Sequence, residues 1–144
     1  PPTHSLHPAL LTGVTLSRSN VRTFKHNDMD DLRKVLEDIQ REDKKLRRKA
    51  AGQRRFIVVE GLYRNYGDIC PLDELVVLKN EFFYRLIVDE SLSFGTLGPR
   101  GLGLQVRHTH PHPTRKHTSL THQHSTLLIQ IKSPPRPPNF AGPF

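Results

Sequence analysis

The sequence predicts an α/β fold: an incomplete piece of a larger domain, built on a βαβ unit with parallel strands and flanked by disordered ends. Three segments carry this prediction, namely a buried-strand pattern at 56–59, an amphipathic helix pattern at 71–82 and a second strand pattern at 85–89. Strands joined through a helix are expected to run parallel, with a right-handed crossover. Two strands do not complete a sheet, so the unit is expected to be part of something larger.

A first helix is predicted over about residues 28–40. Asn27 or Asp28 can cap it by accepting hydrogen bonds from its free N–H groups, and the acidic residues of the first turn favour the positive end of the helix dipole. Its apolar side chains fall on one face at helical spacing: Met29, Leu32, Val35, Leu36 and Ile39. The segment 41–55 is read as a charged connector.

The βαβ unit follows the connector. Residues 56–59, Phe-Ile-Val-Val, suit a strand buried on both faces, and Glu60-Gly61 ends it. Pro71 stands well for the first turn of a helix whose apolar positions are Leu72, Leu75, Val76, Leu78 and Phe82. After the strand at 85–89 comes a loop with glycines at 95, 98, 101 and 103, which we read as turn-forming because it lacks the lysine of a phosphate-binding loop.

The composition limits the classes of protein that this chain can belong to. Only 35% of the 144 residues are hydrophobic, Trp is absent and Pro numbers 12. The single Cys excludes an internal disulfide framework and a cysteine-based zinc site. No apolar run approaches the about 20 residues that span a bilayer, and the first residues do not have the pattern of a signal peptide.

The net charge of +8 is concentrated in the C-terminal tail. All 14 acidic residues lie at or before Glu90, whereas six of the 22 basic residues follow it. A basic protein can bind nucleic acid, and the run Lys44–Lys49 is a candidate patch. A solvated helix end or loop is the better account of that run, so we expect no nucleic-acid partner.

Both ends of the chain are expected to lack stable structure. Residues 1–15 show no hydrophobic period, and residues 104–144 contain six of the nine His and seven of the 12 Pro. Such a tail buries too little apolar surface to offset an ordering cost of about 1–2 kcal/mol per residue. Its imidazoles could bind nickel adventitiously, but without a companion Cys or acid we expect no metal site at His108, His110, His112, His117, His122 and His124.

Candidate chemistry lies where the parallel strands end, because ligands of open α/β sheets gather beyond their carboxyl ends. There the chain offers Glu60 and Asp89. Asp89 could pair with the protonated ring nitrogen of a cofactor, or it could simply cap the turn that follows. The connection from Gly61 to Cys70 is long for a strand-to-helix loop, which is typical of functional loops. Cys70 is expected to be packed at the helix start.

Several separated motifs stand along the chain, namely Ser17-Arg-Ser-Asn, Phe24-Lys-His-Asn-Asp-Met29, Arg55-Phe-Ile-Val-Val-Glu-Gly-Leu-Tyr63, Gly67-Asp-Ile-Cys-Pro-Leu72 and Glu90-Ser-Leu-Ser-Phe-Gly95. Together they resemble the subunit-1 family of the serine palmitoyltransferases, within the α-oxoamine synthases and the fold-type-I superfamily that uses pyridoxal phosphate (PLP). The resemblance covers about residues 16–103, which would be a partial large domain of the aminotransferase class I/II type, and leaves 1–15 and 104–144 outside it.

The resemblance implies that this chain has no catalytic residue of its own. Catalytic relatives read Asp-Glu-Ala-His at the strand end, with the Asp on the PLP ring nitrogen and the His on its phenolic oxygen. This chain has Ser91-Leu92 in place of Ala-His, so Asp89 is the only cofactor contact that survives, in vestigial form. The lysine that binds PLP follows Gly103 in those relatives, and the pattern is lost there. PLP is therefore expected on the catalytic partner subunit and not on this chain.

The resemblance also implies the reaction and the partner. The parent enzyme condenses L-serine with palmitoyl-CoA to 3-ketosphinganine at the endoplasmic reticulum membrane, as a heterodimer with its catalytic subunit, and an upstream segment anchors the parent. This chain is expected to be inactive alone. The alternatives are a basic binding module and a non-functional truncated or splice product, with the flanks arising either from intronic or out-of-frame translation or from a genuine isoform.

Overall fold

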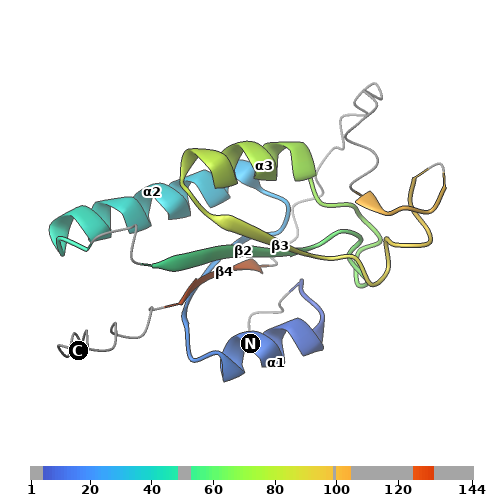
Figure 1. The fold of residues 1–144 in the computed structure, drawn as a ribbon, viewed down its shortest axis with the longest axis horizontal. Helices are drawn as coiled ribbons and strands as arrows, with labels where there is room; N and C mark the ends of the chain where they lie inside the picture. Colours follow the sequence, from blue (N-terminus) through green and yellow to red (C-terminus); the bar gives the residue numbers. More distant parts are fainter. Residues whose placement is uncertain (1–4, 49–52, 99, 105–124, 132–144) are drawn as a thin grey trace, which may run out of the picture.

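The computed structural model describes residues 5–48, 53–98, 100–104 and 125–131 (Figure 1). Helices α2 and α3 lie side by side on one side of a sheet, and α1 lies on the other side. The elements in chain order are α1 (Pro8–Leu16), β1 (Asn20–Lys25), α2 (Met29–Lys45), β2 (Arg54–Glu60), α3 (Leu72–Glu81), β3 (Arg85–Asp89) and β4 (Ser125–Ile131).

The predicted βαβ unit is confirmed. The strands β2 and β3 pair in parallel, with Phe56 opposite Arg85 and Glu60 opposite Asp89, and α3 connects them. The sheet has the order β1-β4-β2-β3, in which β4 runs antiparallel to both β1 and β2. Ile57, Val58 and Val59 in β2 are all buried, as expected for a strand covered on both faces.

The two ends of the chain differ from the prediction of disorder. Helix α1 begins at Pro8, whose missing N–H is not needed in the first turn, and His7 Nδ1 caps the helix by accepting the N–H of Ala9. Leu6 and Val14 anchor this segment because both are buried. The run Ser125–Ile131 forms β4, which supplies the backbone partners that β1 and β2 would otherwise lack. Leu104, the first residue of the predicted tail, is buried, and the rest of the tail lies outside the described residues.

Helix α2 begins as predicted but ends later. Asp28 caps it, because Oδ1 accepts the N–H of Asp31 at 2.9 Å. The predicted end near residue 40 is wrong: the helix continues to Lys45, since the buried face formed by Leu32, Leu36 and Ile39 extends one further turn to a buried acid. The first part of the predicted connector is therefore helical, and its last two residues open β2.

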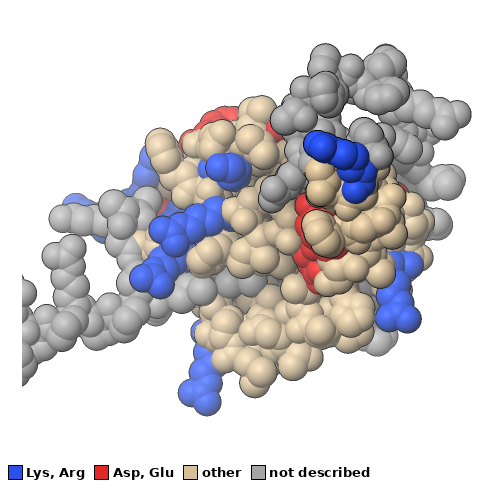
Figure 2. All heavy atoms as spheres, turned by 45° about the vertical axis from the view of Figure 1, so that its right-hand side comes forward, with Lys and Arg blue, Asp and Glu red and all other residues tan. Residues whose placement is uncertain are grey.

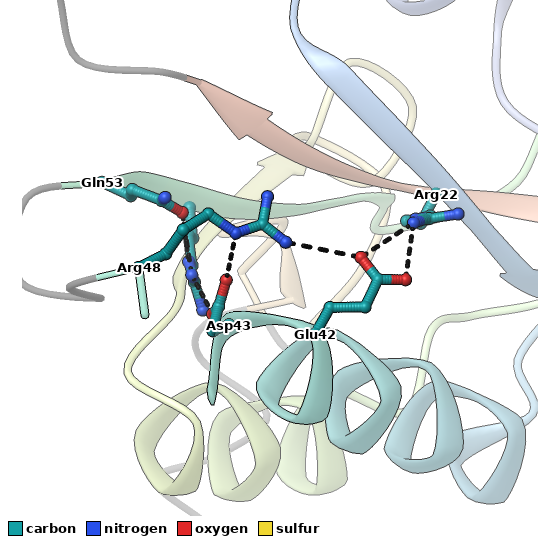
Figure 3. Close-up of polar contacts among 6 residues, drawn as sticks. Arg22, Glu42, Asp43, Arg48 and Gln53 are labelled. Carbon is teal, nitrogen blue, oxygen red and sulfur yellow. Dashed lines mark hydrogen bonds and ion pairs between the residues drawn. The ribbon is translucent and has the colours of Figure 1, made fainter. Parts of the chain in front are cut away.

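That buried acid, Asp43, ties α2 to β2 (Figure 3). Its carboxylate pairs with the guanidinium of Arg55, and both side chains are less than a tenth exposed. Arg48 Nε lies 3.1 Å from Asp43 Oδ1, and Gln53 Oε1 accepts from Arg55 at 2.8 Å. A charge buried this deeply is stable only when it is paired, so the network fixes how the end of the helix meets the start of the strand.

Helix α3 packs the face formed by Leu72, Leu75 and Leu78 onto the sheet, as predicted, whereas Val76, which was also expected on that face, is 37% exposed. It ends in an unusual way. Phe83 follows the C-cap residue with φ = 59°, a left-handed conformation that normally belongs to glycine, and its side chain is 90% exposed. The backbone there is strained for a bulky residue.

We expect Asp43→Ala to lower the free energy of unfolding by about 3–5 kcal/mol, because it leaves Arg55 buried without its counter-charge. Asp38→Ala is the matched control on the same helix, since Asp38 pairs with Arg41 while both side chains are more than half exposed, and its loss should change stability by less than about 0.5 kcal/mol. Urea unfolding of both variants measures this. Equal effects of the two substitutions would contradict a structural role for the buried pair.

Candidate functional site

The carboxyl ends of β2 and β3 bring Glu60 and Asp89 to one edge of the sheet, as the sequence predicts. The two residues stand directly opposite each other in the parallel register. Asp89 is half-buried and Glu60 is buried. This edge is where an open α/β sheet would hold a ligand, so what these carboxylates contact decides what the edge can do.

The Asp89 carboxylate makes its described hydrogen bonds within its own turn. Its Oδ1 accepts the backbone N–H of Ser91 at 2.8 Å and also the hydroxyl of Ser91. Of the two roles that the sequence allowed for Asp89, cofactor contact and turn capping, these hydrogen bonds are those of a turn cap. Leu92, which follows, is 41% exposed and offers no polar atom to a ligand.

Glu90 closes the glycine-containing loop that follows β3. Its Oε2 accepts the backbone N–H of Leu104 at 3.0 Å and the hydroxyl of Ser93, which is fully buried. Gly103 lies against this carboxylate with φ = 82°, and a Cβ there would collide with Oε2. One carboxylate thus joins the start, middle and end of the loop over 90–104.

The loop between β2 and α3 is hydrogen-bonded to the end of β3. The N–H of Gly61 donates to the carbonyl of Asp89 at 2.8 Å, and the N–H of Cys70 donates to the carbonyl of Gly61 at 3.2 Å. A Cβ at Gly61 would lie 2.6 Å from Ser93 Oγ, so only glycine fits there. The long connection predicted at 61–70 is therefore a closed, internally bonded loop.

Glu60 also has a structural partner. Its Oε1 accepts the backbone N–H of His7, which precedes α1. A buried carboxylate needs such donors to offset its lost hydration, and this one draws the N-terminal segment onto the sheet edge. The carboxylates of Glu60, Asp89 and Glu90 thus accept hydrogen bonds from the chain itself.

A polar cluster at the same edge escaped the sequence analysis. His26 Nε2 lies 2.8 Å from Asp68 Oδ2, which also accepts from the Asn27 amide at 2.9 Å. The His26 ring packs against Tyr63 and Tyr66, with centroids 4.4 and 4.7 Å apart. Burial, with the nearby Asp68 carboxylate, raises the pKa of Tyr66. Recognising 20–25 as a strand would have predicted the cluster, because β1 and β2 point the same way and the residues after them meet.

Cys70 is buried just before α3, as predicted. Burial raises the pKa of its thiol to about 12, and the carboxylates of Glu90 and Asp68 add to the effect. At neutral pH the thiolate is therefore negligible, and Cys70 is not a nucleophile.

The residues at this edge do not fit PLP. The Asp89 carboxylate is already engaged by its turn, and Leu92 cannot hydrogen-bond a ring oxygen. The loops over 61–71 and 90–104 contain no lysine that could bind the cofactor covalently. Within the described part of the chain, no group of three or more His, Cys, Asp or Glu could hold a metal, and the six tail histidines lie outside it.

The basic groups do not form one continuous track on the face shown in Figure 2, where blue side chains lie in separate groups with uncharged surface between them. Lys44 and Lys45 end α2, and Arg47 and Arg48 follow it, so the predicted solvated helix end is confirmed for these residues. No helix in the described ranges combines the length and apolar character needed to cross a membrane.

Curated relatives from plants, slime mould and yeast match the chain closely. "Long chain base biosynthesis protein 1" of Arabidopsis thaliana is 46% identical over 106 residues, which are 74% of this chain and 21% of the relative. "Serine palmitoyltransferase 1" of Dictyostelium discoideum is 50% identical over 92 residues, 64% of this chain and 18% of the relative. The chain thus spans about a fifth of the length of these relatives, and the resemblance to subunit 1 is confirmed.

Two solved structures are also similar. One is a serine palmitoyltransferase variant from S. paucimobilis with a bound PLP–myriocin aldimine, 35% identical over 56% of this chain and 18% of that one, with a TM-score of 0.44. The other is a serine palmitoyltransferase with PLP as the internal aldimine, 25% identical over 75% of this chain and 26% of that one, also with a TM-score of 0.44.

The family model for aminotransferase class I and II matches residues 1–107. This range includes 1–15, which the sequence analysis placed outside the resemblance, and it contains every contact described above at the sheet edge. The chain therefore belongs to the aminotransferase class I and II family.

Proposed function

We propose that this chain is part of the non-catalytic first subunit of serine palmitoyltransferase and that its role is structural. One observation carries the proposal: the Asp89 carboxylate, at the position where catalytic relatives contact the PLP ring, accepts hydrogen bonds from Ser91. A carboxylate fixed by its own turn stabilises the loop and has less to offer a protonated ring nitrogen. At most, Asp89 is a vestigial cofactor position.

In this proposal the parent enzyme condenses L-serine with palmitoyl-CoA and releases carbon dioxide, giving 3-ketosphinganine for sphingolipid biosynthesis at the endoplasmic reticulum membrane. The catalytic partner subunit carries PLP, which acts as the electron sink of the reaction, together with the lysine that binds it. Residues 16–103 then contribute part of the large domain to a heterodimer.

The glycine-containing loop offers a surface for that partner. Leu92, Phe94 and Leu102 are 41%, 68% and 41% exposed, and we call them the apolar loop surface. The bridge between Phe94 and Leu102 and the Glu90 contacts hold this loop in shape. A pre-shaped apolar surface loses little entropy when a partner covers it, which favours binding there.

We expect the chain to co-purify with the catalytic subunit of serine palmitoyltransferase when the two are expressed together. Phe94→Ser should lower recovery about ten-fold, because a large exposed aromatic is a typical interface anchor. Val77→Ser is the matched control, since Val77 is 60% exposed on α3, away from the loop. Recovery that is absent for the wild type, or equal for the two variants, would argue against this partner surface.

We expect the isolated chain to form no specific covalent adduct with PLP. Exposed lysines of any protein react weakly with the aldehyde, so borohydride reduction followed by peptide mapping should give low, scattered labelling. The catalytic subunit, treated in parallel, should give one lysine labelled stoichiometrically. A single stoichiometric site in this chain, with serine-dependent release of carbon dioxide, would show that it is an enzyme.

A further inference from the structure

A hollow of about 400 Å³ lies at the opposite end of β2 from Glu60. We call it the basic hollow. Its rim includes Lys44, Arg47 and Arg48, where α2 ends, and its apolar lining includes Leu36 and the buried ring of Tyr84. The volume falls within the range of small-molecule sites, and the combination of charged rim and apolar floor is typical of them.

The basic hollow carries uncompensated positive charge. Four cationic side chains and one acid, Asp43, line it, and Asp43 is already shared by Arg55 and Arg48. Lys44 and Arg47 make no ion pair with any residue that the structure describes. Lys44 and Arg47, which pair with no described residue, stand beside a guanidinium that Glu42 and Asp43 hold in place (Figure 3), and these three cations together make a partly pre-organised site for an anion.

A second, larger hollow on the other flank of α2 has a smaller excess of positive charge. Its volume is about 610 Å³, and its three cations face two acids. Arg22 and Arg41 are paired there with Glu42 and Asp38. Because the two hollows share a helix but differ in charge, the second provides an internal control.

Phe83 gives the basic hollow an aromatic wall at a cost in stability. It is 90% exposed and has φ = 59°, and Arg47 on the rim also has a positive φ, of 49°. A left-handed conformation costs a residue with a Cβ roughly 1–2 kcal/mol. Each of these residues follows a helix C-cap and lets the next N–H close the helix: Tyr84 N–H donates to the carbonyl of Lys79 at 2.8 Å, and Arg48 N–H to that of Asp43 at 2.9 Å.

We propose that the basic hollow binds a small organic phosphate that bears an aromatic group. Lys44 and Arg47 receive the phosphate, and Phe83 stacks on the aromatic ring. The geometry favours a small ligand over a nucleic-acid strand, because a strand requires a continuous basic track and the cations here converge on one cavity. This inference is independent of the proposed structural role at the other end of the sheet.

The test uses the whole 144-residue chain and two probes, phenyl phosphate and inorganic phosphate, titrated by calorimetry at constant ionic strength. Phenyl phosphate should bind about three- to ten-fold more tightly, because only it can stack on an aromatic wall. Lys44→Gln and Arg47→Gln should each weaken it about ten-fold, the usual effect of one charge-assisted hydrogen bond. Arg41→Gln and Lys45→Gln, which line the second hollow, should leave affinity within about two-fold.

The variant Phe83→Gly distinguishes an effect on ligand binding from an effect on stability. It should raise the thermal midpoint by relieving the left-handed strain, while it weakens phenyl phosphate about three- to ten-fold and leaves inorganic phosphate unchanged. The proposal would be overturned if the control variants weakened binding equally, or if the two phosphates bound with equal affinity. It would also be overturned if the chain bound a single-stranded oligonucleotide but not phenyl phosphate.

Discussion

Carboxylates at the carboxyl edge of the sheet accept hydrogen bonds from the chain's own backbone, and the shape of that edge depends on this. Glu60 holds the segment before α1, Asp89 holds its own turn, and Glu90 joins the loop end at Leu104 to its start. A buried or half-buried carboxylate must find donors to offset its lost hydration. Here the donors are internal, so these carboxylates hold the N-terminal segment and the loop after β3 in place.

At the other end of the sheet, a buried ion pair lies beside the basic hollow. The Asp43–Arg55 pair is buried and costly to break, and it positions the end of α2 over the start of β2. Directly beside it, Phe83 and Arg47 occupy strained conformations at the basic hollow. The buried ion pair thus fixes the end of the helix on which the rim of the basic hollow stands.

The sequence was sufficient for the βαβ unit because local signals agreed there. The apolar run in β2 and the apolar face of α3 each indicated burial directly. The end of α2 was missed because its last buried residue is Asp43, a charge whose partner Arg55 is known only from the fold. Likewise α1 and β4 depend on long-range partners, His7 on Glu60 and β4 on two strands distant in sequence.

The candidate site was predictable only in part. Placing Glu60 and Asp89 at one edge follows from parallel strands, and the structure has them in register. Which of the two readings of Asp89 holds could not be decided from residue type, because a carboxylate suits a turn and a cofactor equally. The cluster of His26 and Asp68 was missed because β1 has one buried residue, Phe24, and so lacks a clear strand pattern.

Hydrogen exchange of the Leu104 amide tests most directly whether the edge carboxylates are structural. If Glu90 accepts this N–H as described, the amide should exchange at least about a hundred-fold more slowly than in an unstructured chain. Glu90→Ala should abolish that protection and leave the amides of Ile57 and Ile87, in the β2–β3 ladder, unchanged. Unprotected exchange at Leu104 in the wild type, or protection that survives Glu90→Ala, would contradict a structural role for this carboxylate.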